Sequence, residues 1–198
     1  MAGMAQYDMT KVVVLGFDPD SGSDFGGSGV VLATTRKVLA VGVATMPKKA
    51  QGKWAVAQQC QQVQKLLRRV VKIGRIDRAV LEIPMDYGEK RVARIEDIMP
   101  LSLVSGCARG VIEEFCSRVD FVEPWQWKGQ RKKGPDQRNS LKYFGWDFDD
   151  RGGGTAKPKF SIPRNVLVLS EGITEKHHCE IADAMGLALY ALDREGAA

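Results

Sequence analysis

Three acidic residues interrupt segments of this chain that are otherwise apolar. Asp18 ends a β-branched run that begins at Lys11, Glu82 lies near the end of a second such run, and Asp183 is flanked by small and apolar residues. Acidic side chains are rarely buried without a partner, because removing a carboxylate from water is costly. Each acid alone could cap a turn, pair with an arginine or face solvent. One explanation serves all three if folding brings them around a divalent cation, which relieves their mutual repulsion.

The hydrophobic pattern predicts helices packed on a sheet. Short, β-branched apolar runs predict five strands, at 11–18, 29–34, 38–45, 78–83 and 119–122, with a hairpin turn at 35–37. Apolar residues at helical spacing predict helices from 53 onward and at 98–115, 136–144 and 178–192. Residues 149–164 are rich in Gly, Pro and Lys, and we expect a mobile loop there. Three strands followed by alternating helices and strands are typical of a mixed α/β layer architecture.

Length and composition set the class of protein. The 198 residues suit one domain, and we expect 1–198 to form it. The first eleven residues contain no apolar core of a signal peptide, and the four cysteines form no C-x-x-C pair. We therefore expect reduced thiols and a cytoplasmic protein, bacterial or phage-encoded, or an organellar one, but not a secreted or membrane-bound one.

Basic residues gather in two runs. Six basic residues and one acid lie between Lys65 and Arg78, and four basic residues and no acid lie between Trp125 and Lys133. The net charge is +5. Either run could be a solvated face, or it could bind the phosphates of a nucleic acid.

Several motifs occur together in one order along nearly the whole chain. They are G-F-D-P-D at 16–20, L-E-I-P at 81–84, the glycines 106 and 110, P-W-Q-W-K at 124–128, and A-D-A-M-G-L-A-L-Y at 182–190. Each motif is weak alone, but the ordered set resembles the RuvC-type Holliday-junction resolvases of the ribonuclease H-like superfamily. The similarity is greatest to their phage relatives and to the chloroplast resolvases of plants. It implies a ribonuclease H-like, mixed five-stranded sheet flanked by helices.

The resemblance also implies a metal site. Asp18, Glu82 and Asp183 match the family's metal-binding acids, which hold two Mg²⁺ ions, with Mn²⁺ as a possible substitute. A fourth ligand lies a few residues before the last acid in the family. Glu180 is the favoured candidate here, and His178 is the second choice. Carboxylate oxygens are the hard ligands that Mg²⁺ prefers.

The second basic run corresponds to a segment beside the family's active site. The resemblance implies that Lys128 contacts the scissile region and that Arg131, Lys132 and Lys133 grip backbone phosphates. Trp127 is a candidate for stacking at a branch point, although core packing is an equal alternative. Contacts with phosphates position DNA without reading its sequence.

These inferences predict a structure-selective endonuclease that resolves Holliday junctions in DNA recombination and repair. The resemblance further implies a homodimer whose two-fold axis involves the 98–115 helix, so that two sites could cut opposing strands of a four-way junction. The alternatives are a ribonuclease H-like nuclease acting on flaps, RNA–DNA hybrids or replication intermediates, a DNA-binding protein without catalysis, and a scaffold protein.

Overall fold

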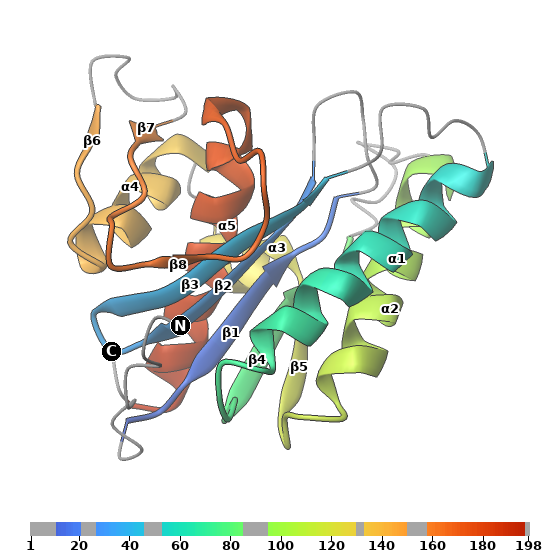
Figure 1. The fold of residues 1–198 in the computed structure, drawn as a ribbon, viewed down its shortest axis with the longest axis horizontal. Helices are drawn as coiled ribbons and strands as arrows, with labels where there is room; N and C mark the ends of the chain where they lie inside the picture. Colours follow the sequence, from blue (N-terminus) through green and yellow to red (C-terminus); the bar gives the residue numbers. More distant parts are fainter. Residues whose placement is uncertain are drawn as a thin grey trace.

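A central sheet with helices on both faces forms the body of the molecule in the computed structural model (Figure 1). The structure describes residues 11–20, 27–45, 53–84, 95–129, 133–149 and 158–196. The strands are β1 Val14–Asp18, β2 Gly27–Thr34, β3 Lys37–Thr45, β4 Arg78–Glu82, β5 Val119–Val122, β6 Phe148–Asp149, β7 Lys159–Phe160 and β8 Leu167–Val168. The helices are α1 Lys53–Val70, α2 Ile95–Ile112, α3 Pro124–Lys128, α4 Lys133–Tyr143 and α5 His178–Arg194, with a short 3₁₀ turn at Glu175–His177.

The main sheet has six strands in the order β5-β4-β1-β2-β3-β8. β1 pairs antiparallel with β2, and β2 pairs antiparallel with β3, as expected for a meander. β4 pairs parallel with β1, and β5 pairs parallel with β4. The five predicted strands are present, and the mixed α/β class is confirmed. The expected strand number was too low, because the two-residue strand β8 adds to the edge of β3.

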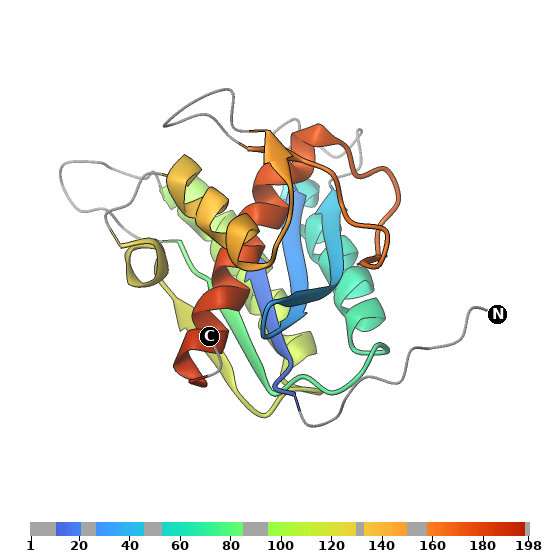
Figure 2. The same ribbon diagram turned by 90° about the vertical axis from the view of Figure 1, so that its left-hand side faces the viewer.

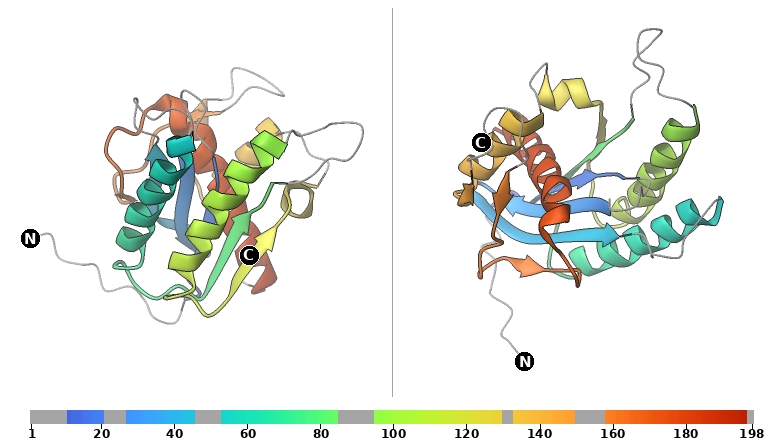
Figure 3. Two further views of the ribbon diagram at one scale, coloured as in Figure 1. Left: turned by 90° about the vertical axis from the view of Figure 1, so that its right-hand side faces the viewer. Right: turned by 90° about the horizontal axis from the view of Figure 1, so that it is seen from above.

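Each face of the sheet has its own hydrophobic core. Side chains alternate along a strand, so consecutive residues within β1, or within β2, point to opposite faces of the sheet. Leu15, Phe17 and the apolar stripe of α1 belong to one core. The left panel of Figure 3 shows α1 and α2 lying over this face of the sheet. The other core contains Val14, Val31 and the buried side of α5, and α4 packs against α5 on the same side of the sheet (Figure 2).

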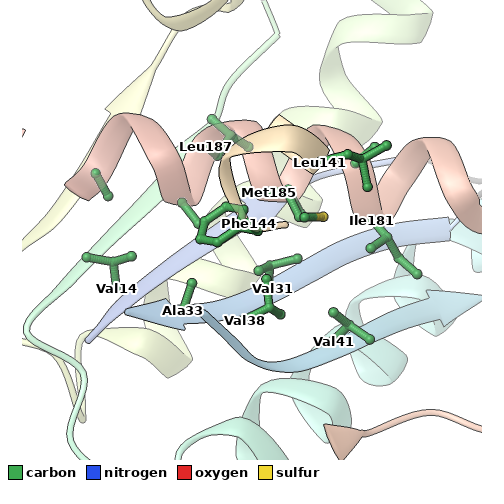
Figure 4. Packing of buried hydrophobic residues seen from close by; sticks show 14 of the residues in the cluster. Val14, Val31, Ala33, Val38, Val41, Leu141, Phe144, Ile181, Met185 and Leu187 are labelled. Atoms are coloured by element: carbon green, nitrogen blue, oxygen red, sulfur yellow. The ribbon is translucent and has the colours of Figure 1, made fainter. Parts of the chain in front are cut away.

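Helix α5 lies directly on the sheet because glycines remove the side chains that would hold it away. A β-carbon built on Gly16 would overlap the carbonyl oxygen of Ala184, and one built on Gly29 would overlap the carbonyl oxygen of Glu180. Ile181 and Met185 then fill the space above β2 and β3 (Figure 4). A glycine inside a strand often marks such a close approach of another backbone.

The structure departs from the sequence-based expectations in several short segments. Residues 158–164 do not lie wholly in a loop, since β7 pairs antiparallel with β6 across the 149–164 segment. Helix α2 begins at Ile95 rather than at residue 98, and the helical turn α3 was not expected. No disulfide joins the four cysteines. Within the described residues, no helix is long and apolar enough to cross a membrane.

Candidate active site

The sheet places Asp18 and Glu82 side by side. β1 and β4 run parallel, with Phe17 opposite Leu81, and each acid is the next residue along its strand. Adjacent positions in a parallel pair point to the same face of the sheet. Both acids therefore lie at the carboxyl ends of neighbouring strands, where open α/β sheets bind their ligands.

The alternation of side chains turns these two acids toward α5. Gly16, two residues before Asp18, faces α5, because its missing side chain makes room for that helix. Val80, two residues before Glu82, belongs to the core beneath α5. Because every second side chain of a strand points to the same face, both carboxylates point to the side of the sheet that α5 covers.

Helix α5 brings the third acid to the same place. Asp183 precedes Ala184, the residue in contact with Gly16, and its side chain is only 1% exposed. The buried amide of Gln137 on α4 donates a hydrogen bond from Nε2 to Asp183 Oδ1 at 2.9 Å. Gln137 therefore fixes the orientation of a carboxylate that would otherwise be costly to bury.

Lys128 contacts one of these acids, and the charges of all three act on it. Its Nζ is 3.1 Å from Glu82 Oε2 and 4.2 Å from the centroid of the Trp127 ring. Burial lowers the pKa of Lys128, but the charges of Asp183, Glu82 and Asp18 outweigh it, so that the pKa is raised above its ordinary value. Three carboxylates from three separate elements thus act on one ammonium group.

Trp127 is buried, whereas a side chain that stacks on DNA bases has to be exposed. Its ring is 6% exposed and lies against Gly186 of α5, where any β-carbon would overlap it. Its Nε1 donates a hydrogen bond to Glu82 Oε2 at 2.8 Å. Trp127 is therefore a core residue that holds Glu82. The exposed tryptophan of this helical turn is Trp125, at 56%.

The two candidates for a fourth ligand differ in their surroundings. The backbone of Glu180 lies against Gly29, one turn before Asp183 on α5. His178 is buried, and its ring stacks on Phe160 with centroids 4.2 Å apart. Its Nδ1 accepts a hydrogen bond from the backbone amide of Phe160 at 3.2 Å. Burial lowers the pKa of His178, which favours the neutral ring that this hydrogen bond requires.

The carboxylates near Lys128 suit a hard cation, although they do not form an enclosed metal site. Within the described ranges, no three side chains of His, Cys, Asp or Glu stand close enough to enclose an ion. The groups that surround Lys128 are nevertheless carboxylates from β1, β4 and α5, and they already hold one positive charge. Oxygen ligands with this charge fit Mg²⁺ or Mn²⁺.

Part of the expected DNA-binding segment cannot be placed. Arg131 and Lys132 lie outside the described residues, and so does the side chain of Lys133, the first residue of α4. Sequence reasoning missed Gln137, because a glutamine in a polar helix carries no signal of burial. The close approach at Gly16 could have been found, because a glycine within a predicted strand suggests one.

Neither a protein-family model nor a curated protein gives a significant match to the sequence. Solved structures do match. The "Thermus thermophilus RuvC structure" has a TM-score of 0.55 and 17% identity, over 94% of this chain and 98% of that one. The structure titled "T. thermophilus RuvC in complex with Holliday junction substrate" has a TM-score of 0.54 and 16% identity, over 94% of this chain and 97% of that one. These likenesses confirm the predicted ribonuclease H-like fold.

Proposed function

We propose that this chain is a metal-dependent endonuclease that hydrolyses phosphodiester bonds of branched DNA and resolves Holliday junctions. The observation that carries this proposal is that β1, β4 and α5 bring Asp18, Glu82 and Asp183 to one end of the sheet, where Lys128 lies 3.1 Å from Glu82. Three acids gathered around one cationic position suit phosphoryl chemistry better than any structural role, because a fold gains little from burying like charges. The likeness to a RuvC structure solved with a Holliday junction supports the choice of substrate.

Four acids would hold two Mg²⁺ ions, or Mn²⁺ in their place. Asp18, Glu82 and Asp183 form the core of the set, and Glu180 is the fourth member. His178 is less suited, since one ring nitrogen already accepts the amide of Phe160. Bound divalent cations would supply activation of water and charge stabilisation at the leaving 3′ oxygen.

The chain's own residues prepare this site. Trp127 and Lys128 both contact the same oxygen of Glu82, so the carboxylate has one defined orientation. Gln137 does the same for Asp183. Lys128 offsets the mutual repulsion of the acids, and its ammonium is placed to attract the scissile phosphate. Arg131, Lys132 and Lys133 follow Lys128 in sequence, and we assign to them contacts with the flanking backbone.

A homodimer would present two such sites to one junction. Met99 and Leu103 of α2 are exposed at 58% and 53%, which is unusual for large apolar side chains. Gly106 and Gly110 face open space in the protomer. Because packing against the described residues does not require these glycines, we assign this face of α2 to the second copy.

The test is cleavage of a labelled four-way junction with and without Mg²⁺, alongside flap, RNA–DNA hybrid and linear duplex substrates. We expect Mg²⁺-dependent cutting with a preference for the junction. Asp18→Asn removes a charge from the metal-binding set, so it should abolish cutting and leave junction binding within a few-fold.

Asp147→Asn is the matched control, because Asp147 is exposed and lies outside the site. Cutting by Asp18→Asn at the unmodified rate would remove Asp18 from the site. Preferential cutting of flaps or hybrids would redirect the proposal to another nuclease class, and the absence of cutting on every substrate would refute catalysis.

A further inference from the structure

A basic face of α1 has no part in the site described above. Lys65, Arg68 and Arg69 of α1 are exposed, as is Lys72 in the turn that follows, and α1 contains no acidic residue. At 100° per residue the three α1 side chains fall within roughly a third of the helix circumference, and Lys72 extends the series by one turn. They therefore form one positively charged stripe, which corresponds to the first basic run of the sequence.

The stripe borders a groove between α1 and the end of β3. The groove has a volume of ≈ 230 Å³, and its polar lining includes Gln62, Lys65, Arg69 and Ser170. Glu171 is the one acid that lines it. Among the described residues, two cationic groups thus oppose a single carboxylate, which gives the groove a net positive charge.

Two donors in this groove are held in place by the backbone. Arg69 donates from Nη1 to the carbonyl oxygen of Leu169 at 2.7 Å, which fixes the guanidinium while its other N–H groups remain to donate. The Ser170 hydroxyl accepts a hydrogen bond from the Val43 amide at 2.7 Å, so its own proton points elsewhere. Within the described residues, Lys65 has neither an ion-pair nor a hydrogen-bond partner.

The groove lies at the same end of the sheet as the acids, but beside α1, which covers the face opposite to α5. Asp18 pairs with Gly29, and Gly29 pairs with Val43, which lines the groove. Two strand spacings separate Asp18 from Val43 at the backbone, which is about 10 Å. One strand of DNA rises about 3.4 Å per nucleotide, so this separation within the sheet sets a minimum of roughly three nucleotides between the two sites.

We infer that this groove binds a backbone phosphate of the DNA, about three or more nucleotides from the bond that is cut. The contacts are with phosphate oxygens, so they hold a junction arm without reading its sequence. The inference rests on the proposed function for its choice of polyanion. No described side chain of α1 is large, apolar and exposed, but Leu167 and Val168 of β8 are exposed close to the groove, so an anionic membrane is the alternative that the experiment must separate from DNA.

The experiment measures junction binding by fluorescence anisotropy between 50 and 200 mM salt, in Ca²⁺ to prevent cutting. Lys65→Gln and Arg69→Gln are compared with Lys37→Gln, which removes the same charge from the exposed first residue of β3. One lost phosphate contact lowers the slope of log K against log salt by about 0.9. The unmodified protein should then lose about 3.5-fold more affinity over this range than Lys65→Gln does.

Lys65→Gln keeps the hydrogen bonds of Arg69 with Leu169 and of Ser170 with Val43, so its result stands even if Arg69→Gln unfolds. A salt slope for Lys65→Gln equal to that of Lys37→Gln would overturn the inference. So would loss of binding to phosphatidylglycerol vesicles with junction binding unchanged, because the surface would then serve a membrane. The proposed function fails separately, through absence of Mg²⁺-dependent cutting by the unmodified protein.

Discussion

Trp127→Phe tests whether the indole holds Glu82 for metal binding. The substitution keeps an aromatic ring against Gly186 and removes the donor that lies 2.8 Å from Glu82 Oε2. A hydrogen bond to a charged group contributes about 1.5–3 kcal/mol, which corresponds to roughly 10- to 150-fold in an equilibrium constant. Loss of a group that orients a metal ligand typically weakens metal binding about 10- to 100-fold. We therefore expect the half-saturating Mg²⁺ concentration for cleavage to rise by about 10- to 100-fold.

The assay is the initial rate of junction cutting across a Mg²⁺ titration. At saturating Mg²⁺ the rate should recover to within a few-fold, because Phe leaves the acids themselves intact. Trp146→Phe is the matched control, since Trp146 is equally buried in the same core and packs edge-on against Phe160. Equal Mg²⁺ titration curves for the two variants would refute the role of the indole.

Two further substitutions test the supports of the site. Gly186→Ala introduces a β-carbon that overlaps the Trp127 ring. We expect the free energy of unfolding, measured by urea denaturation, to fall by about 1–3 kcal/mol. An unchanged midpoint of the urea denaturation curve would show that the ring can move away freely. Gln137→Leu removes the amide that donates to Asp183, which should raise the half-saturating Mg²⁺ concentration and cost about 1–3 kcal/mol of stability. A stability loss with an unchanged Mg²⁺ titration would limit Gln137 to a structural role.

The positions of two acids follow from the sequence, because strand ends are readable from it. Asp18 and Glu82 each end an apolar run, and in parallel strands such ends meet at one edge. Asp183 reaches the same place only because α5 packs closely against Gly16. The sequence G-F-D permits this close packing but does not prove it. The strand β8 was not predictable, since two residues carry no periodicity.

The roles of the two tryptophans also lay beyond the sequence. Trp125 and Trp127 are two residues apart in a helical turn, so they point in quite different directions, and only the tertiary structure decides which one is buried. Gly186 makes the space that Trp127 occupies, although the two positions are far apart along the chain. Spacing within P-W-Q-W-K carries no information about that distant glycine.

The order of the elements along the chain has a consequence for synthesis. α5 follows every strand of the sheet, and it supplies Asp183 and one whole side of the β1–β2 packing. A ribosome-bound chain that ends before residue 178 therefore lacks both Glu180 and Asp183 and leaves one face of its sheet uncovered. Under the proposed function, the growing polypeptide cannot cut nucleic acid until this final helix has emerged and docked.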